Sequence, residues 1–113
     1  MSVKLTNRQV GDVTVIDVAG RITLGEGSST LRDALRELVK KDHKKILLNL
    51  RDVTYIDSSG IGELVGSYTT VTNRGGKLKL LHLPAKLNEL LHVTQLITVF
   101  EVYENEQDAL KSF

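Results

Sequence analysis

The run Ile46-Leu47-Leu48-Asn49-Leu50 constrains the fold of this chain more than any other segment. Its near-continuous apolar character is typical of a strand that is covered on both faces, as in a parallel sheet packed between helices. Apolar residues recur at helical spacing before and after this run, in residues 31–39 and 61–72, and predict two amphipathic helices. Together these patterns predict an α/β fold.

A hairpin is predicted at the start of the chain. Apolar and polar residues alternate from Val3 to Val18 on both sides of Val10-Gly11-Asp12, which predicts two antiparallel strands and a tight turn. Residues 20–29 carry three glycines and no sustained periodicity, so a loop is predicted there, before the first helix.

The second half of the chain alternates in the same way. The pattern predicts a strand over residues 78–83, a helix with Pro84 in its first turn, a fifth strand over residues 97–102, and a short helix that Asn105 caps and that ends near Phe113. A hairpin followed by alternating helices and strands predicts one mixed five-stranded sheet with about four helices, antiparallel in the hairpin and mainly parallel elsewhere.

Length and composition limit the classes of function. At 113 residues the chain fits a single domain, 1–113. A net charge of +1 is too balanced to attract nucleic acid, and the absence of cysteine excludes disulfides, thiol catalysis and thiolate metal sites. The three histidines lie far apart in sequence, so neither a metal nor a cofactor is expected. No apolar signal segment and no run of about 18 apolar residues is present, which predicts a cytoplasmic protein without membrane contact.

The most informative segment is Asp57-Ser58-Ser59-Gly60-Ile61-Gly62, where a strand leads into small and polar residues at a helix start. These residues are typical of an exposed helix N-terminus, where a Ser or Asp oxygen accepts from unpaired backbone N–H groups. Gly60 would let another surface approach the backbone closely. A phosphate on Ser59 would face the same N–H groups and the positive end of the helix dipole. From the residues alone, a simple capped helix is an equally good interpretation.

This segment, after the strand Ile46–Leu50, resembles the signature of the STAS domain family, the anti-sigma factor antagonists. The similarity covers nearly the whole chain and includes the opening hairpin, Gly20-Arg21-Ile22, Leu31-Arg32 and Gly75-Gly76-Lys77-Leu78. It implies a non-enzymatic protein whose unphosphorylated form binds an anti-sigma factor that is also a serine kinase of the GHKL ATPase type. This binding frees the sigma factor, phosphorylation reverses it, and a PPM-type phosphatase restores it.

The resemblance also implies roles for individual residues. The family's phosphoacceptor is the hydroxyl residue before the motif glycine, which is Ser59 here, and Asp57, Ser58, Gly60 and Ile61 would support it or contact the partner. Asp57 is predicted either to orient the loop or the acceptor hydroxyl, or to act only as a helix cap.

One departure from the family concerns the loop before the first helix. Many relatives place an Asp near Thr23, and Glu26 could replace that carboxylate or simply be a solvated loop charge.

Three other interpretations of the sequence stand beside this one. A STAS scaffold or sensory-complex module without a phosphorylation switch is the alternative that the sequence leaves open. A serine hydrolase using Ser58 or Ser59 is disfavoured, because a nucleophile elbow needs a glycine where Asp57 stands. The glycines of residues 20–27 resemble a phosphate-binding loop in spacing only, since Glu26 occupies the place of the required lysine.

Overall fold

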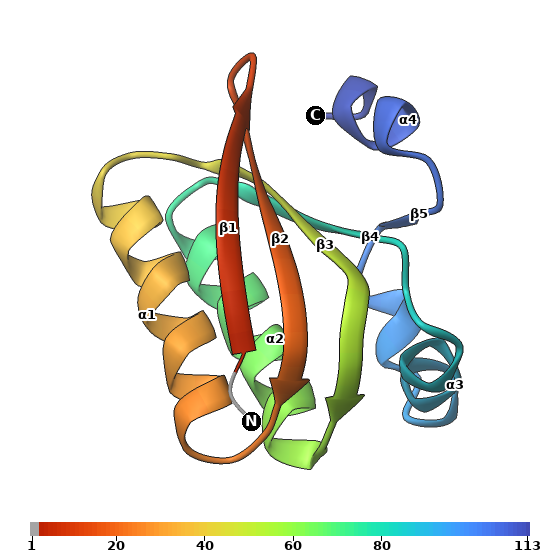
Figure 1. The fold of residues 1–113 in the computed structure, drawn as a ribbon. Helices are drawn as coiled ribbons and strands as arrows, with labels where there is room; N and C mark the ends of the chain where they lie inside the picture. The colour runs from red at the N-terminus through yellow and green to blue at the C-terminus, as the bar shows by residue number, and fades with distance from the viewer. Residues whose placement is uncertain (1–2) are drawn as a thin grey trace.

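Five strands form one mixed sheet in the order β1-β2-β3-β4-β5 in the computed structural model, which describes residues 3–113 (Figure 1). The strands are β1 (Val3–Val10), β2 (Val13–Ile22), β3 (Lys45–Ile56), β4 (Lys77–Leu81) and β5 (Val102–Tyr103). β1 is antiparallel to β2, and the pairs β2–β3, β3–β4 and β4–β5 are parallel. The predicted mixed α/β sheet and its opening hairpin are confirmed.

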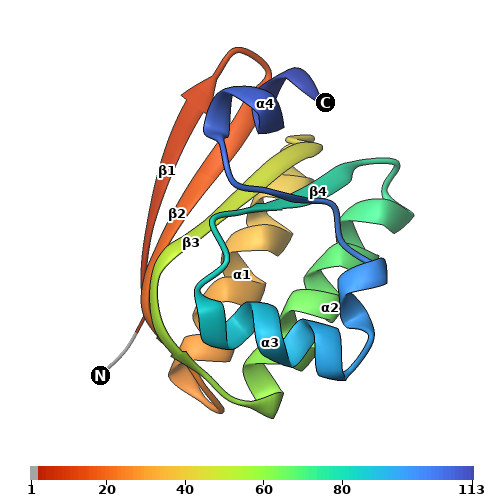
Figure 2. The same ribbon diagram turned by 90° about the vertical axis from the view of Figure 1, so that its right-hand side faces the viewer.

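The helices lie on both sides of this sheet. They are α1 (Glu26–Lys40), α2 (Ser58–Asn73), α3 (Ala85–Val93) and α4 (Glu106–Lys111), with a short 3-10 helix at Leu96–Thr98. α1 and α2 run side by side along one face, and α4 lies across the opposite face near the β1–β2 turn (Figures 1 and 2).

The strand β3 is buried from both faces, as its apolar run predicted. Ile46, Leu48 and Leu50 belong to the large core under α1, α2 and α3, whereas Leu47 belongs to a second, smaller core under α4. That smaller core also contains residues of three other elements, namely Val13, Val15, Leu81 and Ala109. Both helix layers are therefore needed to remove β3 from water.

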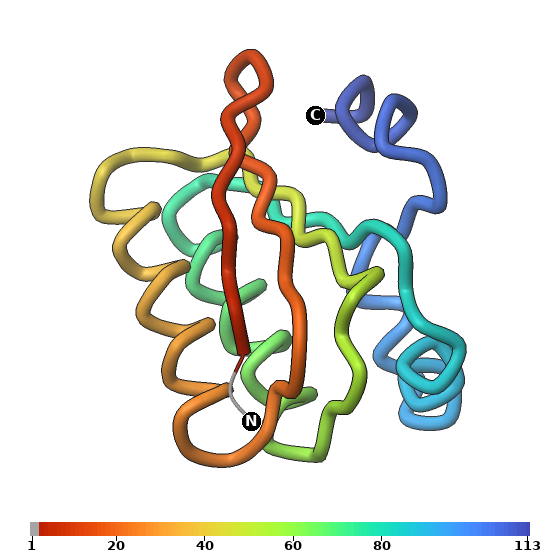
Figure 3. The backbone as a smooth tube through the Cα atoms, viewed as in Figure 1, coloured from red at the N-terminus to blue at the C-terminus, as the bar shows by residue number. Residues whose placement is uncertain are grey.

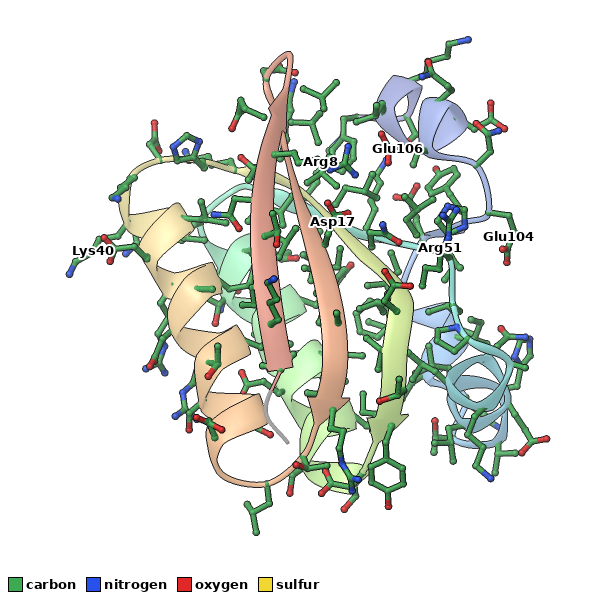
Figure 4. The ribbon with its side chains drawn as sticks, viewed as in Figure 1. Arg8, Asp17, Lys40, Arg51, Glu104 and Glu106 are labelled. Carbon is green, nitrogen blue, oxygen red and sulfur yellow. The ribbon has the colours of Figure 1, made fainter. Side chains whose placement is uncertain are left out.

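An ionic cluster holds α4 against the hairpin. The Arg8 guanidinium donates to Asp17 on β2 at 2.6 Å and to Glu106 of α4 at 2.9 Å (Figure 4). These bonds lower the pKa of both carboxyls below their ordinary values, because the positive charge of Arg8 stabilises their ionised forms.

Three predicted boundaries are wrong, and the first is the start of α1. Residues 20–29 do not form one loop, because α1 begins at Glu26. The backbone N–H and the hydroxyl of Ser28 both donate to the Thr23 carbonyl, and Ser29 N–H donates to the Gly25 carbonyl. These local bonds, which span five and four residues, satisfy a first helical turn whose composition alone favours a loop.

The fifth strand is the second wrong boundary. It covers only Val102–Tyr103, and Leu96–Thr98 forms a 3-10 turn. Gln95 turns the chain with a left-handed φ of 63°, and Phe100 packs edge-on against Tyr68 of α2 at 5.4 Å between ring centroids. The apolar residues of this segment therefore cover the core end-on instead of pairing in the sheet. β4 also stops early, before His82, whose φ of 56° ends the strand.

Residues 3–113 contain neither a membrane-spanning helix nor a metal-binding cluster. No helix there is long and apolar enough to cross a bilayer. The same residues contain no group of three or more His, Asp or Glu side chains placed to hold a metal ion.

Candidate functional site

The candidate site lies where β2 and β3 end. Because these strands are parallel, their carboxyl ends meet at one edge of the sheet, and each leads into a helix there. The backbone trace shows both connections, β2–α1 and β3–α2, at the lower end of the molecule (Figure 3). We call this end the Ser59 pole.

The Asp57 carboxylate joins the two connections. Asp57 is the N-cap of α2, and its Oδ1 accepts a hydrogen bond from Gly60 N–H at 2.9 Å. Its Oδ2 accepts from Leu24 N–H in the β2–α1 loop at 3.1 Å. One side chain therefore caps a helix and also fixes the neighbouring loop.

These two backbone donors also set the charge of Asp57. Hydrogen bonds from Gly60 N–H and then Leu24 N–H lower the pKa of the Asp57 carboxyl below its ordinary value, because both stabilise the carboxylate. Ile61 N–H donates to the backbone carbonyl of Asp57 at 3.0 Å. Of the unpaired N–H groups at this helix start, that of Gly60 is therefore already engaged, while Ile61 N–H makes the first intrahelical bond.

Gly60 is buried, and its close neighbour belongs to the same chain. A Cβ atom at this position would collide with the carbonyl oxygen of Ile22, the last residue of β2, and would lie 2.5 Å from the Ile56 side chain. The close approach that the sequence predicted at Gly60 is thus made by β2, and no room is left for another surface. Gly27, in the first turn of α1, has the same relation to the Arg21 carbonyl at 2.6 Å.

The remaining motif residues lie at or near the surface. Ser58 is exposed, Ser59 is half-buried, and Ile61 is half-buried with its side chain packed against the large core. All three belong to the first turn of α2. The structure therefore brings the predicted residues together on one helix end.

A groove of about 410 Å³ opens beside this turn, between the end of β3, the start of α2 and α3. Its walls are mainly apolar and include residues from all three elements: Tyr55, Ile56, Ser58, Ile61, Lys86 and Leu90. The contribution of Lys86 and Leu90 could not be predicted from the sequence, because α3 reaches this position only through the fold, where Tyr55 of β3 joins them.

Two large apolar side chains are exposed at the same pole. Leu24 in the β2–α1 loop is 79% exposed, and Tyr55 near the end of β3 is 51% exposed. The Arg21 guanidinium lies over the Tyr55 ring, 4.8 Å from its centroid. Tyr55 also lines the apolar groove, and an exposed aromatic side chain in such a groove is typical of a protein-binding surface. The placement of Leu24 between glycine and threonine was the one signal in the sequence that could have indicated this surface.

The loop residues that depart from the family pattern have structural roles. The Thr23 carbonyl receives both bonds from Ser28, and Glu26 is exposed in the first turn of α1, where a carboxylate complements the helix dipole. The carboxylate that holds this loop is that of Asp57.

Comparison with known proteins gives one family. Residues 4–109 match the profile of the family described as STAS domain. The chain is 29% identical over 102 residues to the anti-sigma-B factor antagonist of Bacillus subtilis (strain 168), covering 90% of this chain and 92% of that protein.

Solved structures share the fold. An anti-sigma factor antagonist from Mycobacterium paratuberculosis superposes with a TM-score of 0.85 at 20% identity, covering 97% of this chain and 92% of that one. The Bacillus cell fate determinant SpoIIAA in its phosphorylated form superposes with a TM-score of 0.76 at 17% identity, covering 96% of this chain and 98% of that one.

Proposed function

The chain belongs to the STAS domain family, and from this membership we propose that it is an anti-sigma factor antagonist controlled by phosphorylation of Ser59. Its unphosphorylated form binds an anti-sigma factor that is also a GHKL-type serine kinase, and this releases the sigma factor. Phosphate on Ser59 ends the binding, and a PPM-type phosphatase restores it. In this proposal the protein is a ligand and a kinase substrate rather than an enzyme, and it acts in the cytoplasm, where its partners regulate transcription.

Two comparisons support the proposal. The curated relative from Bacillus subtilis is named an anti-sigma-B factor antagonist and aligns over nine-tenths of the chain. The Bacillus protein SpoIIAA, which shares the fold, has been described in both an unphosphorylated and a phosphorylated form.

The observation that carries the proposal is the place of Ser59. Ser59 is half-buried in the first turn of α2, one position before Gly60. The apolar groove and the exposed Leu24 and Tyr55 side chains lie at the same pole. A phosphate at this position would stand at the edge of an apolar docking surface. It would therefore alter the surface that a partner contacts.

The charge of the phosphate is sufficient for a switch without refolding. A phosphoserine adds about −1.5 to −2 charges, and here it would be added two residues from the ionised Asp57 carboxylate, which already accepts from Gly60 N–H. The phosphate cannot use that donor without displacing Asp57, so it presents its charge to the partner. Reversing a 1:99 population needs about 5.5 kcal/mol, of which like-charge contact across an interface supplies several.

The other motif residues then have supporting roles. Asp57 fixes the first turn of α2 and the β2–α1 loop, and Gly60 lets α2 lie against β2. Ser58 and Ile61 line the groove that the partner would enter.

The proposal is tested by calorimetric binding to the GHKL-type anti-sigma kinase encoded in the same genome, together with a phosphorylation assay. We expect Ser59→Ala to bind like the natural chain and to take up no phosphate, and Ser59→Asp to bind about tenfold more weakly or worse. Thr69→Ala removes an exposed hydroxyl farther along α2, outside the groove; it is the control and keeps both binding and phosphorylation.

Equal affinity of the Ser59→Ala and Ser59→Asp variants for the kinase would contradict the switch. Binding without phosphorylation of any serine would favour the alternative, a STAS scaffold module without a phosphorylation switch.

A further inference from the structure

A second groove lies far from the Ser59 pole, between the C-terminal halves of α1 and α2. It has a volume of about 500 Å³ and is lined by Asp33, Arg36, Glu37, Val39, Lys40, Thr70 and Arg74. Lys40 points away from the sheet at this end of α1 (Figure 4). We call this surface the α1–α2 groove.

The helical repeat explains why the groove is charged. Asp33, Arg36, Glu37 and Lys40 follow the spacing i, i+3, i+4, i+7, so they form one stripe along α1. A different stripe, with Leu31, Leu35 and Leu38, faces the core. Thr70 of α2 and Arg74, the C-cap residue of that helix, stand at spacing i, i+4 and face the same groove.

The cations of the groove lack partners, whereas its acids have them. Arg36, Lys40 and Arg74 form no salt bridge within residues 3–113. Asp33 lies 4.0 Å from Arg32 and Glu37 lies 3.5 Å from Lys41, and neither of those cations lines the groove. The groove lining carries three cations against two carboxylates, and those carboxylates have ion partners outside it, so the groove presents an excess of positive charge.

Neighbouring lysines differ in this respect. In the basic run 40–45, Lys44 lies 3.5 Å from Asp42, and Lys45 lies 2.6 Å from Asp12. Within this run the positive charge that remains free is thus concentrated at Lys40, on the groove side.

We propose that the α1–α2 groove binds an acidic, extended segment of a partner protein. Glu37 stands between Arg36 and Lys40 along α1, so a compact anion such as phosphate would meet a carboxylate as well as the cations. An extended peptide can place separate carboxylates opposite Arg36, Lys40 and Arg74 and leave a gap opposite Glu37. Charge complementarity of this kind sets specificity and association rate.

The position of the groove permits binding at both ends of the molecule. The 15 residues of α1 span about 22 Å between the Ser59 pole and Lys40. A segment in the groove therefore leaves Ser59 and its neighbouring groove uncovered. The inference does not depend on the function proposed for Ser59.

The test is an NMR titration of the isotope-labelled chain with a short synthetic peptide of Asp, Glu and Gly. We expect amide shifts to concentrate in residues 33–40 and 70–74 and affinity to fall as salt rises. The variant Arg36→Gln/Arg74→Gln should bind about three- to tenfold more weakly. Both arginines are exposed, so the fold is retained, which circular dichroism checks.

The matched control is Lys4→Gln/Lys111→Gln, which removes the same charge from exposed positions on β1 and α4. Equal weakening by the control, or shifts spread over all surface lysines, would overturn the proposal. Inorganic phosphate producing the same shifts at the same concentration would also overturn it, because the site would then be one for a small anion. Retained peptide binding by Ser59→Asp separates this result from the test of the switch.

Discussion

The Ser59 pole contains two strand–helix junctions, β2–α1 and β3–α2. Each places a glycine of the first helical turn against the end of β2. Only the β3–α2 junction, however, has a side chain that caps its helix. Gly27 faces the Arg21 carbonyl and Gly60 faces the Ile22 carbonyl. α2 is capped by Asp57, whereas Gly25, the N-cap residue of α1, has no side chain to offer.

The difference shows that the β2–α1 loop depends on its neighbour. Its Leu24 N–H donates to Asp57, which belongs to the other junction. The exposed Leu24 side chain and the helix end that carries Ser59 are thus fixed by the same carboxylate. A partner that contacts the loop and a phosphate that changes Ser59 would act on one connected structure.

The glycine at the β3–α2 junction gives the largest expected effect. Gly60→Ala should lower the free energy of unfolding by about 3 kcal/mol, because its Cβ would collide with the backbone carbonyl of Ile22. Urea denaturation measures this change. Gly62→Ala is the control: its Cβ has no neighbour within 4 Å, so it should stabilise α2 by about 0.5–1 kcal/mol. Equal stability of the two variants would remove the argument for close packing.

The glycine at the β2–α1 junction should matter somewhat less. Gly27→Ala places a Cβ 2.6 Å from the Arg21 carbonyl, and the uncapped loop can shift to relieve part of the overlap. We expect a loss of about 2 kcal/mol in the same urea experiment. A larger loss than for Gly60→Ala would show that the β2–α1 junction is the more rigid of the two.

Removing the shared carboxylate should loosen both junctions. Asp57→Ala is expected to destabilise the fold through the lost N-cap and to speed amide hydrogen exchange at both Gly60 and Leu24. Asn105→Ala, which removes the cap of α4, is the control and should leave both amides protected. Faster exchange at Gly60 alone would mean that the β2–α1 loop keeps its conformation without the hydrogen bond to Asp57.

Acid should weaken the hydrogen bonds that Asp57 accepts from Gly60 and Leu24, and this effect on stability should be smaller than those of the substitutions above. The folded-state pKa of Asp57 lies below its ordinary value, so the carboxylate stabilises the fold above about pH 4. That contribution disappears as the pH falls through the folded-state pKa. The stability difference between the natural chain and Asp57→Asn should therefore shrink below about pH 4 in urea denaturation. A stability difference that stays constant with pH would show that the negative charge of Asp57 does not strengthen its hydrogen bonds to Gly60 and Leu24.

Local patterns predicted most of the architecture. The alternation of β1 and β2, the apolar run of β3 and the helical stripes of α1 and α2 each require one kind of burial, and the structure provides it. The prediction of the fifth strand is wrong because apolar residues can be buried either by pairing in the sheet or by packing against the edge of the core. Residues 97–102 have the composition of a strand, but Phe100 and its neighbours meet the core from the edge, against Tyr68.

The candidate site shows the same division. The sequence by itself determined that Asp57, Ser58 and Ser59 stand at the start of a helix, because capping depends on residues adjacent in the chain. It could not determine that Asp57 also binds Leu24, that Gly60 faces Ile22, or that α3 completes the groove beside Ser58. These relations join residues far apart in sequence. They exist only because the parallel strands β2 and β3 end at the same edge of the sheet and bring their loops together.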